Sequence, residues 1–382
     1  MPDLLIYADT ERSAALRHEV PIAIGDPFLY AERDGRVAVQ ASSLERERLA
    51  EARPDAELHD IADLGFHELL ESGMARSELE LELAMRLVER LGVTDALVPA
   101  EFPLGLADKL RARGVSLTPD HDLFAARRRS KAPAEMEGIR RAQRAAEAGM
   151  AAAAALFRAA DVGDGERGPT LHVGGAPLTA EQVRAAMRAA TRELGAETPP
   201  DVIVASVWQG FGHEAGSGPL PANLPIQVDL WPRDEASSCW ADMTRTFLVG
   251  EVPEEARRQE ELVHEVLRRT SAAARPGVTG RELHAITCEV FEGAGYRTQR
   301  TGPGDDPSEG FQFSLGHGVG LEVHEDPSLG QAGRAPLVAG DVLAVEPGLW
   351  DRHVGGVRFE DLWLVTEDGI ENLTDFPYDL AP

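Results

Sequence analysis

Cysteine, aromatic residues and positive charge are all scarce in this chain, and each shortage excludes a class of protein. The 382 residues include two cysteines, Cys239 and Cys288, too few and too far apart for a disulfide framework or a paired-thiol zinc site. Aromatic residues make up 5%, and 38 Lys and Arg stand against 65 Asp and Glu, for a net charge of -27. Because such a field repels phosphates and anionic head groups, neither nucleic acid nor a membrane surface is expected as a partner.

Long apolar runs are absent as well. The longest, Met150–Phe157, falls well short of the roughly 20 residues that a membrane-spanning helix needs. The first residues, Met1–Asp9, carry acids where a secretory signal has positive charge and a longer apolar core. Together with the low cysteine count, these features predict a cytoplasmic protein, and the 43% hydrophobic content is enough to build a large core.

The first third of the chain alternates strand-like and helix-like patterns. Leu4–Ala8, Ile22–Ile24 and Val37–Gln40 are typical of strands. A helix is predicted over Glu78–Arg90, where leucines recur every four residues, and Leu97–Val98 follows as another short strand. This order predicts an α/β domain over residues 1–126.

A basic run, Arg127–Lys131, marks the boundary with a second domain over residues 127–382. In so acidic a chain, we interpret this run as a hinge whose cations pair with nearby carboxylates, in preference to a nucleic-acid site. A long helix is predicted from Ala134 to about Ala160.

The second domain shows signs of an internal duplication. Thr179 and Thr279 each open a capping box at the start of a helix, and strand-like sequence follows both helices. Two copies of a helix with antiparallel strands predict a pseudo-symmetric domain with a cleft between its halves. The glycine-rich segment Asp161–Ala176 resembles an insertion, either a surface loop or a dimer contact.

Two pairs of acidic residues are candidates for metal binding. Asp229 and Asp242 lie in strand-like runs, and folding this hairpin about Glu235–Ala236 places them directly opposite, with Cβ atoms about 4.5 to 5.5 Å apart. Like charges at that distance destabilise a sheet, and a divalent cation would neutralise them. Glu346 and Glu360 repeat the arrangement. The alternative is that all four are separate surface acids.

A glycine-rich run, Gly316–Gly320, adds a histidine to these acids. Glycines on both sides of His317 allow the backbone to pass close to a ligand while the ring points inward. We interpret His317 as a metal ligand and His324 as a donor next to the ligands; an ordinary core or surface histidine is the alternative. Four carboxylates and one imidazole suit two divalent ions better than one, with Asp229, Asp242, His317, Glu346 and Glu360 as the ligand set.

This series of motifs resembles the pita-bread metallopeptidases, in the Xaa-Pro peptidase branch that contains prolidase and aminopeptidase P. The motifs are, in order, Asp229, Asp242–Thr246, Gly316–Gly320, Glu346–Gly348 and Arg358–Asp361. The resemblance continues less strongly from Pro133 back into the amino-terminal part. It implies an α+β protein, with a creatinase-like α/β amino-terminal domain followed by a pseudo-two-fold pita-bread catalytic domain.

The resemblance also implies roles for individual residues. By this resemblance, the four acids and one histidine named above are ligands of a dinuclear site, in which Asp242 and Glu360 bridge the two ions. His213 and His324 occupy the positions of the substrate-binding histidines, and Arg358 that of an arginine next to the ligands, which we also assign to substrate binding. His213, His324 and Glu346 are the predicted catalytic residues.

Some positions depart from the pattern of the family. Leu230–Trp231 and Trp240–Ala241 replace the customary residues beside the two aspartates, and Phe313 stands where many relatives have a histidine near the residue after the scissile bond. These changes affect the substrate pocket and leave the ligand set intact. Phe211, Phe313 and Trp350 are candidate apolar walls for a proline ring, or else plain core residues.

The predicted function is metal-dependent hydrolysis of Xaa-Pro bonds, mainly in dipeptides, by a hydroxide that bridges two metal ions. Glu346 would pass the proton to the leaving nitrogen. Aminopeptidase P, which acts on longer peptides, is the alternative, and a non-catalytic pita-bread binding module is a further one that the intact ligand set opposes. Manganese, cobalt and zinc all suit the ligands. Relatives are commonly dimers, so a homodimer is expected.

A dipeptidase also needs a cation for the free carboxylate of proline, and Arg46 is the candidate. It follows strand Val37–Gln40 in the segment Ser42–Arg48, where we expect a serine to cap a helix. The alternative is that Arg46 and Arg48 pair with the neighbouring glutamates. We predict that Arg46→Ala lowers kcat/KM for dipeptides by about 2 to 5 kcal/mol and spares tripeptides, as steady-state kinetics on both substrates would measure. Equal loss on both would remove Arg46 from the site.

Overall fold

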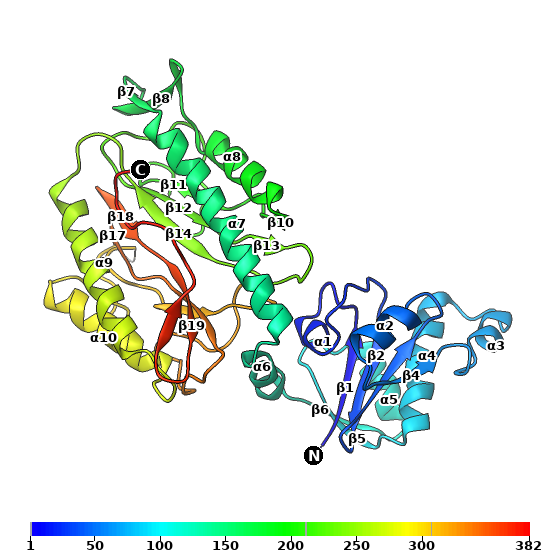
Figure 1. Cartoon of the computed structure of the whole chain (residues 1–382). Helices are drawn as coiled ribbons and strands as arrows, with labels where there is room; N and C mark the ends of the chain where they lie inside the picture. Colours follow the sequence, from blue (N-terminus) through cyan, green and yellow to red (C-terminus); the bar gives the residue numbers. More distant parts are fainter. Residues whose placement is uncertain (1, 211, 307) are drawn as a thin grey trace. The chain divides into compact units, whose positions relative to one another are not determined.

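The chain folds into two compact units, Met1–Arg128 and Arg129–Pro382, in a computed structural model that describes residues 2–210, 212–306 and 308–382 (Figure 1). The sequence places this boundary two residues earlier, between 126 and 127. Basic side chains near it pair with carboxylates of their own unit. Arg127 contacts Glu19 at 2.6 Å in the first unit, and Arg129 contacts Asp341 at 2.6 Å in the second. The expected pairing of this run with carboxylates is therefore confirmed for these cations.

The first unit is a mixed sheet covered on both faces. Its strand order is β4-β3-β2-β1-β5-β6, with β1 antiparallel to β2 and parallel to β5. Successive residues of β1 point to opposite faces, so that Leu5 joins one hydrophobic cluster and Leu4 the other. The strands and helices are β1 Asp3–Ala8, α1 Ala14–Glu19, β2 Phe28–Arg33, β3 Arg36–Ala41, α2 Arg46–Ala52, β4 Glu57–Asp60, α3 Phe66–Glu71, α4 Arg76–Leu91, β5 Asp95–Val98, α5 Leu104–Ala112, β6 Ser116–Pro119 and α6 His121–Arg129.

One predicted strand of this unit is wrong, and three strands, β2, β4 and β6, were not predicted. Ile22–Ile24 is a loop, in which Thr10 satisfies the backbone: the Thr10 hydroxyl donates to the Ile22 carbonyl at 2.6 Å and accepts from the Ile24 amide at 2.7 Å. The strand of this region is β2, which begins after Pro27. The helix predicted at Glu78–Arg90 is the core of α4.

The second unit has two halves, each with a sheet and a pair of helices (Figure 1). Helices α7 and α8 pack on the sheet β11-β12-β14, whereas α9 packs on α10 and on the hairpin β17–β18 of the other half. The elements are α7 Pro133–Arg158, β7 Asp161–Gly163, β8 Thr170–Val173, β9 Ala176–Pro177, α8 Ala180–Glu193, β10 Ala196–Glu197, β11 Ile203–Ala205, β12 Ile226–Leu230, β13 Arg233–Asp234, β14 Met243–Phe247, α9 Glu254–Ala273, α10 Gly280–Gly293, β15 Gly316–Gly318, β16 Val342–Val345, β17 Gly348–Asp351, β18 Gly355–Arg358, β19 Asp361–Val365 and β20 Ile370–Asn372.

Two local expectations for this unit can be compared with the structure directly. Thr179 and Thr279 both form capping boxes, at the start of α8 and α10, as predicted. The insertion-like segment is not a loop, because β7, β8 and β9 form a small antiparallel sheet within it. Arg167 of this segment donates to the Trp208 carbonyl at 3.0 Å and so supports the chain leading to His213. Among the described helices, none is long and apolar enough to cross a bilayer.

The register of the first acidic hairpin differs from the prediction. Asp229 lies opposite Thr244 instead of Asp242, because the turn centres one residue later than Glu235–Ala236. Asp234 sets this turn by accepting hydrogen bonds from the Ser237 amide and hydroxyl. The observed pairing is offset from the predicted one by two residues. Because side chains alternate between faces with a period of two, both aspartates still lie on the same face of the sheet.

The second acidic hairpin has the predicted register. Gly348 pairs with Arg358 on one side, and Val345 pairs with Asp361 on the other. Both pairs share one register, and the same register places Glu346 opposite Glu360 between them. The two glutamates therefore lie directly across from each other.

A buried arginine connects the two halves and the carboxyl-terminal segment. Arg245 of β14 donates to the Asp361 carboxylate of β19 at 2.8 Å, and both side chains are 1% exposed. It also donates to the carbonyls of Glu360 at 2.7 Å and Pro377 at 2.8 Å. Removing one partner of such a pair leaves an uncompensated buried charge.

We predict that Arg245→Met destabilises the second unit by about 3 to 5 kcal/mol, because the buried Asp361 would keep its hydrogen bonds from Asn372 and Tyr378 but lose the cation that pairs with it. Tryptophan fluorescence during urea unfolding measures this unit alone, since all five tryptophans lie in it: Trp208, Trp231, Trp240, Trp350 and Trp363.

The matched control is Arg268→Met. Arg268 pairs with Glu265 at 2.7 Å, but its side chain is 69% exposed, so its loss should cost less than about 1 kcal/mol. Equal effects of the two substitutions would contradict the connecting role of Arg245.

Candidate metal centre

Residues from both halves of the second unit converge on one acidic cluster. Ligand atoms lie within 4.8 Å of one another in three overlapping triads, which are Asp229 with Asp242 and Glu360, His317 with Glu346 and Glu360, and Asp242 with His317 and His324. Because the triads share members, they form one continuous site. The structure thus brings together all five residues that the sequence indicates as ligands.

The buried aspartate at the centre of this cluster fits a cation. Asp242 is 5% exposed, and its Oδ1 has no hydrogen-bond partner among the described residues. An isolated buried carboxylate oxygen is costly unless a charge or donor compensates it. Oxygen ligands with a single imidazole are a donor set that divalent manganese, cobalt and zinc accept. The residues present therefore fit divalent metal ions.

The ring of His317 is oriented for coordination. Its Nδ1 lies 3.1 Å from the Gly318 carbonyl oxygen, to which the protonated nitrogen donates. The other nitrogen, Nε2, faces the carboxylates, at 3.7 Å from Asp242 and 3.9 Å from Glu346. A hydrogen bond that fixes the proton on Nδ1 leaves Nε2 free to bind a metal.

The glycines beside His317 have a different purpose from the one predicted. A Cβ at Gly316 would lie 1.9 Å from the Ala344 carbonyl oxygen, and one at Gly318 would lie 2.3 Å from the Asp326 carbonyl oxygen. These glycines allow the backbone of β15 to pack closely against neighbouring backbone. This packing orients the His317 ring, and the ring, not the backbone, faces the ligand site.

Among the described residues of the acidic cluster, Arg358 supplies the positive charge. It forms an ion pair with Asp229 and a second with Glu346, whose Oε2 lies 3.2 Å from its Nη1. Burial opposes the charge on Arg358, but Asp229 and Glu346 outweigh it and raise the pKa of this guanidinium above its usual value. Thr244 donates to Glu360 at 2.7 Å and fixes that carboxylate.

The acids of the cluster repel one another in the absence of metal. Burial and the charge of Glu360 raise the pKa of Asp242 well above its usual range. Burial and the charge of Glu346 do the same to the pKa of Glu360. Burial lowers the pKa of His317, which favours the neutral ring that a metal requires.

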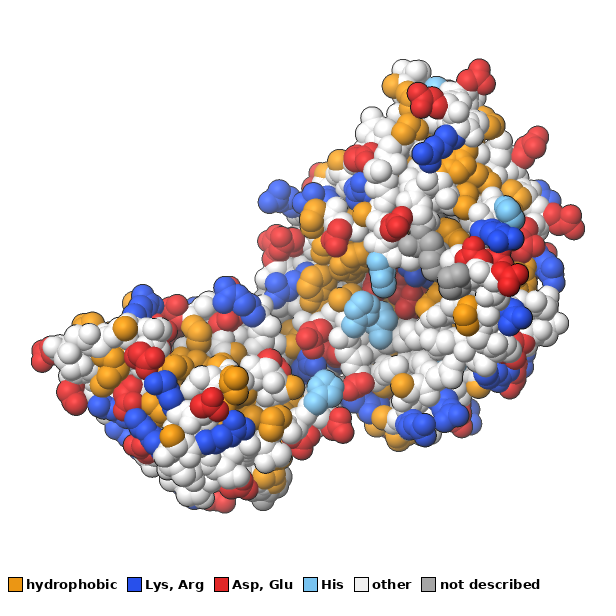
Figure 2. Space-filling view, turned by 180° about the vertical axis from the view of Figure 1, so that it is seen from behind, with side chains coloured by type: hydrophobic (Ala, Val, Ile, Leu, Met, Phe, Trp, Pro, Cys, Tyr) orange, Lys and Arg blue, Asp and Glu red, His pale blue; other side chains and the backbone are white. Residues whose placement is uncertain are grey.

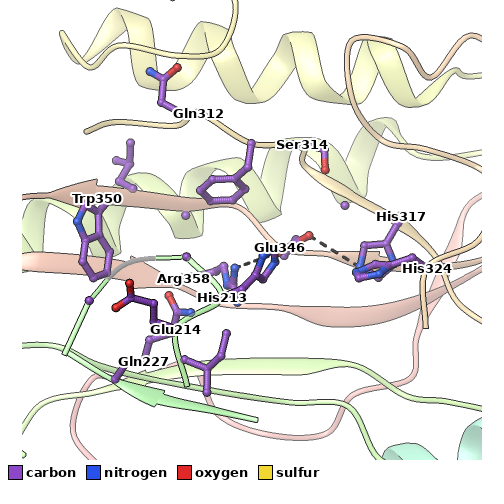
Figure 3. Close-up of a pocket in the computed structure, with 18 of the residues that line it drawn as sticks. His213, Glu214, Gln227, Gln312, Ser314, His317, His324, Glu346, Trp350 and Arg358 are labelled. Atoms are coloured by element: carbon purple, nitrogen blue, oxygen red, sulfur yellow. Dashed lines mark ion pairs between the residues drawn. The ribbon is translucent and has the colours of Figure 1, made fainter. Parts of the chain in front are cut away.

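The cluster adjoins a cavity of about 530 Å³, which is within the usual range for ligand sites. Figure 2 shows histidine side chains gathered beside carboxylates in a hollow of the second unit. His317, Glu346 and Arg358 line it, together with the exposed rings of His213 and His324. Figure 3 shows the His317 and His324 rings at one end of this view and His213 nearer its middle.

The structure places the predicted apolar walls as follows. Phe313 and Trp350 line the cavity, although both also contact the core: Phe313 packs edge-on against Phe311, with ring centroids 4.9 Å apart, and Trp350 is 9% exposed. Phe211 lies outside the described residues. The sequence analysis missed Glu214 and Gln227, which also line the cavity.

A buried ion pair holds the loop that carries His324. Lys131 contacts Glu325, and their side chains are only 4% and 2% exposed. The Glu325 backbone in turn exchanges two hydrogen bonds of 2.9 Å with Gly318, next to His317. The sequence indicates Lys131 only as part of a basic run, so its position beside the site was not predicted.

Arg46 lies in the first unit, and its expected surroundings are only partly correct. Helix α2 begins at Arg46 after Glu45, which makes no side-chain cap, so the serine cap is wrong. Arg46 is 51% exposed and lies 3.6 Å from Asp60, whereas Arg48 pairs with Glu45. Contact of Arg46 with a substrate carboxylate stays a prediction.

Comparison with known proteins identifies the family of this region. Residues 137–367, more than half of the chain, match the model of metallopeptidase family M24. The chain is 41% identical over 134 residues to an Xaa-Pro dipeptidase of Pyrococcus furiosus, covering 35% of each chain. It is 35% identical over 183 residues to an Xaa-Pro dipeptidase of Pyrococcus horikoshii, covering 47% of this chain and 48% of that protein. These alignments span between about a third and a half of the relatives' own length.

Solved structures share the fold over nearly the whole chain. A prolidase from Pyrococcus horikoshii OT3 superposes with a TM-score of 0.75 at 22% identity, covering 100% of this chain and 95% of that one. An X-Pro aminopeptidase from Thermotoga maritima gives 0.76 at 21% identity, covering 98% and 96%. The α+β fold expected from the sequence, with a pita-bread second unit, is therefore confirmed.

We predict that manganese stabilises the wild-type second unit by about 3 kcal/mol or more at a hundredfold excess over Kd, and that Asp242→Asn loses this gain together with metal uptake. Without metal, the variant should be the more stable of the two at pH 8. Because the folded pKa of Asp242 lies above its unfolded value, its contribution to stability falls as pH rises from the unfolded pKa through the folded one, and asparagine has no such loss.

Urea unfolding followed by tryptophan fluorescence, with elemental analysis of dialysed protein, measures both effects. Glu235→Gln removes one exposed acid of the same unit and serves as the control. Full manganese uptake by Asp242→Asn would contradict the assignment of the centre.

Proposed function

The chain belongs to metallopeptidase family M24, and we propose that it hydrolyses Xaa-Pro peptide bonds with two divalent metal ions, preferring dipeptides. The observation that carries the proposal is the convergence of four acids and His317 beside a cavity. Asp229, Asp242, His317, Glu346 and Glu360 would hold the ions. Two similar proteins named Xaa-Pro dipeptidase support the choice of substrate.

When bound, divalent ions of this kind lower the pKa of water and polarise a carbonyl group. The chain supplies the proton transfer and the positioning. Glu346 is the group for moving a proton to the leaving nitrogen, since it lines the cavity with its side chain 15% exposed and has a pKa raised by desolvation, which suits a carboxyl group that must take up and release a proton. His213 and His324 line the cavity and would donate hydrogen bonds to the substrate and to the developing oxyanion.

Arg358 reduces the net negative charge of the acidic cluster. Its ion pairs with Asp229 and Glu346 orient two of the acids and offset part of their charge. Because it also lines the cavity, it can contact the substrate as well.

Recognition of proline must rest on shape. An Xaa-Pro bond has no amide N–H, so a site for it cannot use that donor. Phe313 offers apolar surface in the same cavity as the histidines. We further propose a creatinase-like first unit, a cytoplasmic location and a homodimer.

The proposal is tested with metal-replete protein and manganese, cobalt or zinc in turn. Leu-Pro should be cleaved, and Leu-Pro-Gly more slowly. Cleavage of neither peptide with any of the three metals would refute the proposed activity, and faster cleavage of the tripeptide would replace the dipeptidase by an aminopeptidase.

We predict that His213→Ala and His324→Ala each retain manganese but lose about 100-fold or more in kcat, because they contact the substrate and not the ions. Elemental analysis and steady-state kinetics measure the two properties separately. The control is His353→Ala, which removes an exposed histidine of the β17–β18 turn and should change neither. Loss of metal in either the His213 or the His324 variant would show that the substituted histidine is a ligand.

A further inference from the structure

One end of the cavity carries polar side chains that the proposed reaction does not use. Glu214 and Gln227 both line the cavity, as does Trp350. Figure 3 shows these three at the end of the view opposite His317 and His324, with Glu346 and Arg358 between the two groups. A carboxylate in this position is a feature of the substrate pocket and not of the metal centre.

The strand β12 relates Gln227 to the metal centre. Gln227 precedes Asp229 by two residues, so both side chains leave the same face of the sheet. At about 3.3 Å per residue, their Cα atoms lie roughly 6.6 Å apart along the strand. Gln227 is therefore the next residue along the strand from Asp229 on the same face, and it lines the cavity.

Gly210 leaves room for the Glu214 carboxylate. A Cβ at Gly210 would lie 1.5 Å from the Glu214 Oε2, so a side chain at position 210 would require this exposed carboxylate to move. Gly210 also has a φ of 128°, which side chains rarely allow. Gly210 and Glu214 both line the cavity.

The charge of Glu214 indicates which part of the substrate it meets. The proline of an Xaa-Pro dipeptide carries a carboxylate, which Glu214 would repel, and its ring has no positive charge. A cation is available only on the first residue, either at the α-amino group or on a Lys or Arg side chain. The α-amino nitrogen is about 2.5 Å from the scissile carbonyl carbon and so stays beside the metal ligands.

A side chain can reach the other end. An extended lysine places its ammonium roughly 6 Å from its own Cα, which matches one side-chain repeat of β12. We propose that Glu214 and Gln227 form a subsite for the cationic side chain of the residue before proline, with Trp350 packing against its methylene groups. This inference rests on the proposed function, and it makes Lys-Pro and Arg-Pro the preferred dipeptides.

The test compares Lys-Pro with Met-Pro, because methionine has a similar length and no charge. For the manganese-loaded wild type, we expect kcat/KM to favour Lys-Pro by about tenfold, with most of the difference in KM, since the contact is remote from the scissile bond. Glu214→Gln should reduce this ratio about tenfold. Glu214→Lys should make Lys-Pro a poorer substrate than Met-Pro. The same variant should cleave Glu-Pro better than Met-Pro.

Glu235→Gln removes one exposed acid outside the cavity and should keep the wild-type ratio. An unchanged ratio in Glu214→Gln, or a wild type that cleaves Met-Pro as well as Lys-Pro, would overturn the subsite while leaving the peptidase in place. Cleavage of no Xaa-Pro dipeptide by the wild type would overturn the proposed function and this inference with it.

Discussion

The mutual repulsion of four clustered carboxylates, three of them buried, is the constraint on which the second unit depends. Asp229, Asp242, Glu346 and Glu360 cannot all be charged in one place without compensation. The chain offers Arg358, which pairs with two of them, and divalent cations would compensate the rest. Such a cluster has to be held together by the surrounding structure. Arg245 contributes by binding Asp361 and the Glu360 carbonyl from the opposite half.

Strand periodicity explains why much of this centre was predictable. A two-residue period keeps Asp229 and Asp242 on one face even though the turn at Asp234 shifts their pairing by two residues. Glu346 and Glu360 lie in one continuous register and were placed correctly. Predictions that depend on local pattern, such as the capping boxes at Thr179 and Thr279, also agree with the structure.

Features that depend on distant contacts were not predictable. Ile22–Ile24 has the composition of a strand, but it is a loop, in which Thr10 satisfies the backbone. Lys131 and Glu325 are far apart in sequence, and nothing local indicates that they form a buried pair beside His324. Glu214 lines the cavity from outside any helix or strand, so no periodicity reveals it. Gln227 is different, because its two-residue spacing from Asp229 already indicates that both side chains share one face of the strand.

The acidity of the whole chain and the acid at position 214 would act on a cationic peptide in different ways. A net charge of -27 attracts any cation from a distance, raises the rate of encounter and weakens as salt screens it. A single carboxylate in the cavity acts only after docking, on the side chain that reaches it. Because the general field acts equally on all peptides of one charge, it cannot distinguish where on the peptide the charge lies. Discrimination between a lysine before proline and one after it must therefore come from the cavity itself.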